Sequence, residues 1–296
     1  MRSERWDLAV EARDLDSFIT AVKFRLGHTD YTHTELDAGT PATRFATRGN
    51  DFRLEASHAP VGAFRGMVGL QVESSDFSAL GDEAFVPSTE TDMRALFLFE
   101  ETHVGDLKLT FGGRIERVKV VSGGGGPDDA NAPGTPRFDP SQERRFTARS
   151  AALGAVYPLS EVFSVASQLA HTERAPTFYE LFADGPHAAT GNYELGNARL
   201  DKESSNSIDL QLRARSGEHS GSVGVFYSRF RNFIALAGSG VNRREDGLID
   251  PAGDLPEFVY QAVPAKFSGV EAQAHLLLCR CAGELHLDLQ ADYVRA

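Results

Sequence analysis

Apolar residues recur at every second position in segments of roughly ten residues along most of this chain. One face of the segment 107–116 would carry Leu107, Leu109, Phe111 and Ile115, and the other would carry Lys108, Thr110, Arg114 and Glu116. Successive side chains point to opposite faces of a β-strand, so this alternation predicts strands with one apolar and one polar face. No apolar run approaches the ~18–20 residues that a membrane-spanning helix needs. The pattern therefore predicts an all-β protein.

The connections between these segments alternate between short turns and long polar loops. The long loops are expected at about 28–50, 74–91, 121–144, 171–203 and 231–257, and they leave about a dozen antiparallel strands. An outer-membrane β-barrel has short periplasmic turns, long outer loops, an apolar outside and a polar inside. The sequence therefore predicts a transmembrane antiparallel β-barrel. Its lumen would hold Arg53, Glu55, Lys108, Arg114 and Glu116, and lipid would contact Phe97, Phe99, Phe111, Phe226, Tyr227 and Tyr293.

Charge and cysteine content narrow the range of partners. The 296 residues carry a formal net charge of −12, which argues against a nucleic-acid partner because phosphate binding needs clustered Lys and Arg. The two cysteines, Cys279 and Cys281, are two residues apart. On a strand they would point the same way, so we expect no unstrained disulfide between them.

A family resemblance begins where the fourth long loop is expected. Arg174, Pro176, Glu180, Leu181, Gly185 and His187 match the pattern R-x-P-x-x-x-E-L-x-x-x-G-x-H, and Thr190, Tyr193, Glu194, Gly196 and Asn197 match T-x-x-Y-E-x-G-N. Both stretches resemble TonB-dependent outer-membrane receptors. Shorter similarities at 111–114, 232–234, 269–271 and 292–296 follow in the order that the family has.

The resemblance implies a receptor of the Gram-negative outer membrane that takes up a scarce nutrient: an iron-siderophore, haem or a metal ion such as zinc. The family's barrel has about twenty-two strands and encloses an N-terminal plug, and the TonB-ExbB-ExbD complex supplies energy through that plug. We expect residues 1–296 to be a partial barrel without plug, signal peptide or final strands. Alternatives in other classes are a passive porin-like channel and, less favoured, a soluble β-rich binding module.

The resemblance also suggests functional residues. His187, Tyr193 and Glu194 are candidates for ligand binding, whereas a structural role is expected for Arg174, Pro176, Glu180, Leu181, Gly185, Gly191, Gly196 and Asn197. A second candidate is a metal site in the first long loop, formed by His28, Asp30, His33 and Glu35, because imidazole and carboxylate suit zinc. The stretch around Tyr31, His33, Glu35 and His58 is similar to the zinc-uptake branch of the family. No catalytic residue or resident cofactor is expected, so the chain is not predicted to be an enzyme.

Overall fold

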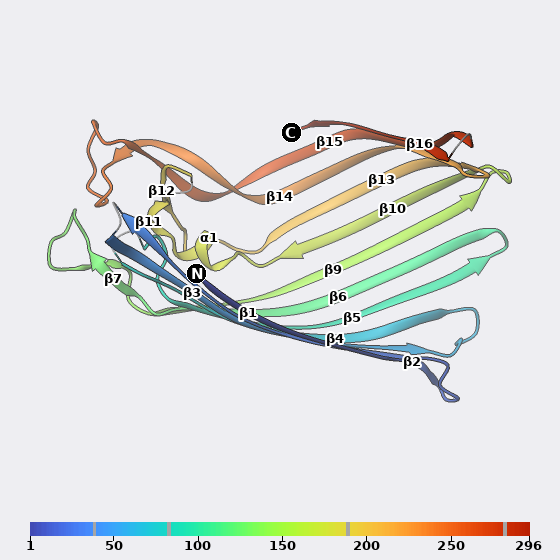
Figure 1. The fold of residues 1–296 in the computed structure, drawn as a ribbon, viewed down its shortest axis with the longest axis horizontal. Coiled ribbons are helices and arrows are strands. Elements are labelled where there is room, and N and C mark those ends of the chain that lie inside the picture. Colours follow the sequence, from blue (N-terminus) through green and yellow to red (C-terminus); the bar gives the residue numbers. More distant parts are fainter. Residues whose placement is uncertain (38–39, 82–83, 188–189, 281–282) are drawn as a thin grey trace.

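Antiparallel strands make up almost all of the computed structural model, which describes residues 1–37, 40–81, 84–187, 190–280 and 283–296. Figure 1 shows these strands curving into an open trough, with the short turns at one end and the long connections at the other. Among the residues described, no helix is long and apolar enough to cross a membrane. The predicted all-β antiparallel fold is confirmed.

Twelve long strands form the wall of the trough within the described ranges. They are β1 (Arg2–Ala12), β2 (Ile19–Asp37), β3 (Thr40–His58), β4 (Arg65–Leu80), β5 (Thr89–Val104), β6 (Leu107–Ser122), β9 (Gln142–Pro158), β10 (Phe163–Arg174), β13 (Glu203–Ser216), β14 (His219–Arg243), β15 (Leu255–Arg280) and β16 (Glu284–Arg295). Each wall strand pairs antiparallel with the next one along the chain.

Two of the long connections carry secondary structure of their own. Between β6 and β9, β7 (Gly125–Asp128) pairs with β8 (Pro136–Phe138) in a small ribbon. The connection from β10 to β13, residues 175–202, is called the inner loop here. It contains α1 (Phe178–Phe182), β11 (Asp184–His187) and β12 (Asn192–Leu195), and β12 joins the wall by pairing parallel with β15. In Figure 1 these three elements lie between the two arms of the trough.

Several predicted long loops are in fact continued strand. The expected loop 28–50 is strand through Asp37 and again from Thr40, and the expected loop 231–257 is strand through Arg243 and from Leu255. In β14 the residues from Phe233 to Ala237 are apolar at every position, which gives no alternation. The segments 28–37 and 43–50 are largely polar on both faces, so the alternation that marks the middle of each strand disappears there. Water on both sides of a sheet imposes no such alternation, and hydrogen bonds to the neighbouring strand keep the backbone extended.

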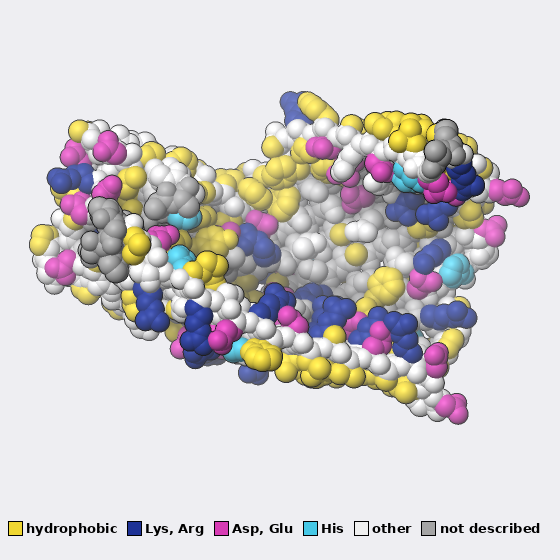
Figure 2. Space-filling view, viewed as in Figure 1, with side chains coloured by type: hydrophobic (Ala, Val, Ile, Leu, Met, Phe, Trp, Pro, Cys, Tyr) yellow, Lys and Arg dark blue, Asp and Glu magenta, His cyan; other side chains and the backbone are white. Residues whose placement is uncertain are grey.

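The two faces of the wall differ as predicted. Exposed apolar side chains on the outer face include Trp6, Leu8, Leu26, Val68, Leu96, Leu98, Phe111, Ile115, Leu153, Leu169, Leu210, Val225, Tyr227 and Tyr293. On the inner face Arg53 lies 2.7 Å from Glu55, and Arg114 lies 2.6 Å from Glu116. Figure 2 shows charged side chains gathered along the concave side of the trough and apolar ones along its lower outer margin. One face therefore suits hydrocarbon and the other suits water.

Three aromatic residues expected to face lipid instead face inward. Phe97, Phe99 and Phe226 share the inner face, and the Arg53 guanidinium lies 4.4 Å from the centroid of the Phe97 ring. The rings of Phe97 and Phe226 lie over glycines of the neighbouring strand: a Cβ added at Gly69 would lie 2.1 Å from Phe97. A glycine thus leaves room for each ring. Phe111, Tyr227 and Tyr293 do face outward, as predicted.

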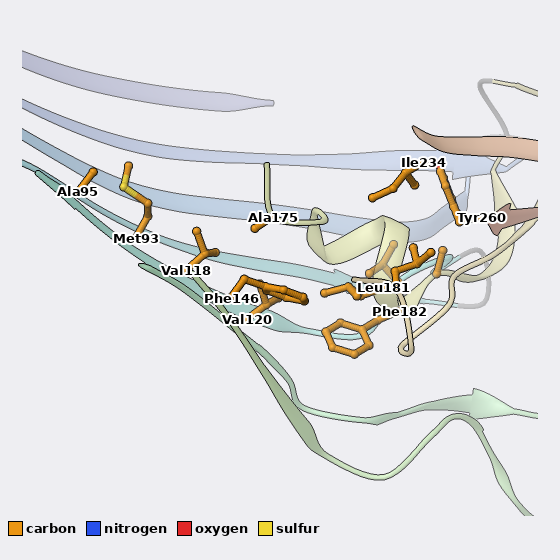
Figure 3. Close-up of a cluster of buried hydrophobic side chains, with 13 residues drawn as sticks. Met93, Ala95, Val118, Val120, Phe146, Ala175, Leu181, Phe182, Ile234 and Tyr260 are labelled. Atoms are coloured by element: carbon orange, nitrogen blue, oxygen red, sulfur yellow. The ribbon is translucent and has the colours of Figure 1, made fainter. Parts of the chain in front are cut away.

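The main hydrophobic core lies where the inner loop packs against the inner face of the wall. Leu181 and Phe182 of α1 approach Val120 and Phe146 of the wall, as Figure 3 shows. The remaining members of this core are Val86, Met93, Ala95, Val118, Ala175, Ala183, Leu200, Ile234 and Tyr260. Burial of apolar surface therefore holds the inner loop inside the trough.

Candidate functional site

An ion-pair brace fixes the start of the inner loop. The Arg174 guanidinium, at the end of β10, donates from Nη1 and Nη2 to the Glu180 carboxylate at 2.8 and 3.1 Å, and from Nη2 to Glu203 at 3.3 Å. Glu180 is buried and also accepts the backbone N–H of Thr177 at 2.7 Å, which caps the first turn of α1. A planar guanidinium that meets a carboxylate in two bonds fixes orientation as well as position.

The other motif residues shape the same loop. Pro176 and Leu181 are buried in its base. A Cβ at Gly185 would lie 2.6 Å from the Cα of Phe85, and one at Gly196 would lie 2.6 Å from the backbone nitrogens of Phe182 and Ala183. Only glycine allows such close approach of two backbones. Gly191 has φ +65°, in the left-handed region that glycine favours, and the Asn197 backbone N–H donates to the Glu180 carbonyl at 2.8 Å.

Tyr193 lies fully inside the loop. Its hydroxyl donates to the Asp184 carboxylate at 2.8 Å, and the Arg243 guanidinium lies 4.5 Å from its ring centroid. Burial raises the pKa of the Asp184 carboxyl and that of the Tyr193 phenol, and the neighbouring carboxylate raises the phenol's pKa further. Tyr193 thus has its polar atom engaged within the protein, which leaves the hydroxyl no free face for a ligand.

Glu194 is likewise enclosed. Its carboxylate contacts His187 Nδ1 at 2.7 Å and accepts the Tyr260 hydroxyl at 3.0 Å and the Thr190 hydroxyl at 3.3 Å. The His187 ring stacks on Phe85, with centroids 4.5 Å apart. Of the three predicted ligand-binding residues, only His187 is partly exposed, with 31% of its side chain accessible against 3% for Glu194.

The structure does not bring together the four residues of the predicted metal site. All four lie on β2, and period-two geometry places His28 and Asp30 on the outer face and His33 and Glu35 on the inner face. His28 Nδ1 contacts Asn50 at 2.8 Å, Asp30 lies 3.2 Å from Arg48, and His33 stacks on Phe45 at 4.7 Å. In the part of the chain that the structure describes, no group of three or more His, Cys, Asp or Glu side chains could hold a metal ion.

A run of aromatic side chains that sequence reasoning missed lines the inner face near the long connections. We call it the aromatic arc: Tyr31, His33, Phe45, Phe77, Phe178, Tyr179 and Tyr260, with successive ring centroids 4.7 to 6.4 Å apart. It passes from β2, β3 and β4 across α1 to β15. The Nδ1 atom of His33 is buried and has no hydrogen-bond partner among the described residues, and Tyr179 remains 37% exposed. The arc offers flat apolar faces beside one unengaged imidazole nitrogen.

The cysteine expectation is wrong in part. Cys279, near the end of β15, is disulfide-bonded, whereas the alternation of strand side chains had argued against a bond. Cys281 lies outside the described residues. The wall pairing is irregular between Leu277 and Cys279, and such a bulge changes the direction of the side chains that follow it.

Comparison with known proteins agrees with this architecture. Residues 2–295 match the family model described as TonB dependent receptor-like, beta-barrel. Among solved structures, the copper transporter OprC is similar at a TM-score of 0.76 and 15% identity, over 99% of this chain and 47% of OprC. The hemophore receptor HasR of Serratia marcescens, solved with its hemophore HasA and heme, is similar at a TM-score of 0.69 and 16% identity, over 99% of this chain and 48% of HasR. The siderophore receptor PirA of Pseudomonas aeruginosa is similar at a TM-score of 0.61 and 14% identity, over 99% of this chain and 56% of PirA. The chain thus spans about half the length of these proteins.

Proposed function

Because this chain belongs to the β-barrel family of TonB-dependent receptors, we propose that it acts in the TonB-coupled uptake of a metal ion or metal chelate across the Gram-negative outer membrane. In this role it binds and passes on its cargo without covalent chemistry. The lipid of the outer membrane, the TonB-ExbB-ExbD complex and the cargo are its partners. The complex would act through a plug, which the match to the barrel model does not include.

One observation carries the proposal: the wall has an apolar outer face and a charged inner face, in a chain that matches the family over nearly its full length. Each strand thereby presents half of its side chains to hydrocarbon and half to an aqueous lumen. Proteins of this fold include a copper transporter, a siderophore receptor and a hemophore receptor. Their cargoes favour a metal ion or its chelate as the class transported here.

The aromatic arc is the best-supported contact surface for such a cargo. Aromatic faces bind planar or apolar ligand groups by stacking, and a neutral imidazole nitrogen can bind a metal. Tyr179 is exposed beside the buried Tyr260, and His33 has a nitrogen without a protein partner. The inner loop holds Phe178 and Tyr179 in place through the Arg174 brace. A change that loosens the inner loop should therefore also displace the side chains that contact the cargo.

Binding by the purified chain in detergent tests the contact surface. Haemin, a ferric catecholate siderophore, Cu²⁺ and Zn²⁺ serve as separate probes, and the variants are Tyr179→Ala and His33→Ala. Tyr157→Ala is the matched control, because Tyr157 lies on the outer face near the short turns. Loss of binding of one probe in both variants, but not in the control, supports the proposal. Equal binding by all variants contradicts the assignment of the aromatic arc.

Uptake in cells tests the transport role. A host without its own receptors for the bound probe should accumulate it when it expresses the chain joined to a plug domain, and only if TonB is functional. Accumulation that is independent of TonB, together with steady conductance of the purified chain in a planar bilayer, would favour a porin-like channel. A chain that stays in solution without detergent would favour a soluble binding module.

A further inference from the structure

Three arginines lie side by side on the outer face of the wall. Arg94 of β5 and Arg117 of β6 are direct cross-strand partners, and Arg149 of β9 pairs with Ile115, two residues from Arg117 on β6. We call Arg94, Arg117 and Arg149 the outer arginine patch. All three side chains are exposed. Their direction is fixed by alternation, since Met93, Val118 and Ala148 beside them are buried on the inner face.

The outer arginine patch has no acidic partner among the described residues. None of its three guanidinium groups forms an ion pair or hydrogen bond there. Two neighbouring carboxylates are engaged elsewhere: Asp92 lies 3.6 Å from Lys119, and Glu173 lies 2.6 Å from Lys202. Like charges directly opposite each other across a strand pair are destabilising. The wall alone gives no reason to keep two arginines in register.

The patch lies immediately beyond the apolar band. The next outer-face residues after Arg94, Arg117 and Arg149, towards the short turns, are Leu96 on β5, Ile115 on β6 and Ala151 on β9. At the short-turn end of the same strands, the outer face carries Glu100, Leu107 and Tyr157 and no basic residue. Basic residues thus lie at the border of the band nearer the long connections. In a barrel with its long loops outside, that border faces the outer leaflet.

A second basic pair lies elsewhere on the outer face of the wall. Arg229 of β14 and Lys266 of β15 are direct cross-strand partners, two residues beyond Tyr227 and Ser268 on the outer face. Both side chains are exposed and neither forms an ion pair with another described residue. Two like-charge pairs on distant parts of the outer face, each nearer the long connections than the neighbouring Leu96 or Tyr227, point to an anion supplied by the surroundings.

We propose that the outer arginine patch binds the phosphate groups of the lipid that surrounds the protein in the outer leaflet, a phosphorylated glycolipid in an outer membrane. Guanidinium groups bind phosphate oxygens through paired hydrogen bonds, and lipid phosphates lie at the depth where the apolar band ends. An anion between Arg94 and Arg117 converts their repulsion into attraction. This inference rests on the proposed membrane placement of the chain.

Titration of the purified chain in neutral detergent with lipid A, followed by native mass spectrometry, tests the inference. The variant is Arg94→Gln/Arg117→Gln/Arg149→Gln. The control, Arg65→Gln/Arg213→Gln/Arg215→Gln, removes the same charge from the inner face of the wall. We expect the patch variant to lose affinity for lipid A roughly hundredfold, and the control to change it less than about twofold. Lipid A stripped of its phosphates should bind the parent chain as weakly as lipid A binds the patch variant.

Three outcomes would overturn the inference: an equal loss of affinity in both triple variants, undiminished binding of phosphate-free lipid A, or displacement of lipid A by inorganic phosphate, which would indicate a free-anion site. Quenching of Trp6 by brominated lipid separates this result from failure of the proposed function, because Trp6 is the only tryptophan and is exposed on the outer face. If Trp6 is quenched but the chain binds lipid A and phosphate-free lipid A equally well, only the role of the outer arginine patch is refuted. Unquenched Trp6 refutes the membrane placement itself.

Discussion

Replacement of Glu180 by Gln should release the first half of the inner loop. The change removes the charge from a buried carboxylate that accepts two bonds from Arg174 and one from the Thr177 N–H. Loss of one partner in a buried ion pair costs about 3–5 kcal/mol. Arg174 is 40% exposed and retains Glu203 at 3.3 Å, so water and Glu203 compensate in part. We therefore expect the loop to lose about 2–3 kcal/mol of stability.

Hydrogen exchange of the inner-loop amides in the detergent-folded chain measures this loss. The amides of Leu181 and Ala183, which donate to backbone carbonyls within the loop, should exchange roughly 30- to 150-fold faster in the variant. Wall amides in β6 should keep their protection. Glu161→Gln, at an exposed position in the β9–β10 turn, is the matched control and should change nothing. A less than threefold change in the Glu180 variant would refute the idea that the brace holds the loop.

Three further changes test other parts of the structure. Gly196→Ala should destabilise the inner loop by about 1–3 kcal/mol, because the added Cβ would clash with backbone atoms. At Gly191 the added Cβ has open space, and only the positive φ is strained. Limited proteolysis should therefore cleave the inner loop faster in the Gly196→Ala variant than in the Gly191→Ala variant. Burial raises the pKa of Asp184, so the folded loop binds that proton more tightly than the unfolded chain does. The hydrogen-exchange protection of the inner-loop amides should therefore fall as pH rises from the ordinary aspartate range through the raised pKa. Asp184→Asn should abolish that fall. Leu210→Arg, on the outer face, should cost about 2–4 kcal/mol in urea titrations of the vesicle-inserted chain, and Gln211→Arg, on the inner face, should cost little.

Strand identity could be predicted where one face of the sheet is apolar. In β6 the alternation of Leu109 and Phe111 with Lys108 and Arg114 fixed both the strand and its faces. The alternation could not assign the two faces of a strand where adjacent residues are all apolar. In β5 the run from Ala95 to Phe99 is apolar at every position, so the inward Phe97 could be recognised only from its glycine partner on β4. Phe226 and Tyr227 are adjacent and cannot both face lipid, which period two alone could have shown.

The candidate site was less accessible to sequence reasoning. The motif around Arg174 and Glu180 lies in the inner loop, where the two side chains contact each other, and its structural role stays a prediction. The aromatic arc joins strands and a helix from distant parts of the chain, and no local pattern reports such neighbours. A usable signal was present in β3 and β4, where Phe45 and Phe77 each occupy an inner-face position in a polar stretch.

Pairing of each wall strand with its successor has a consequence for how such a wall can change in evolution. The unit of construction is an up-and-down hairpin, whose antiparallel backbone pairing within the wall is with its immediate neighbours. Excision of β5 and β6 (residues 89–122) would leave β4 running opposite to β9, with every remaining side chain still on its own face. Trough width can therefore vary in steps of two strands through gene duplication or loss while each surviving strand keeps its faces. Removal of β5 and β6 in particular would also take Val118 and Val120 from the core under the inner loop.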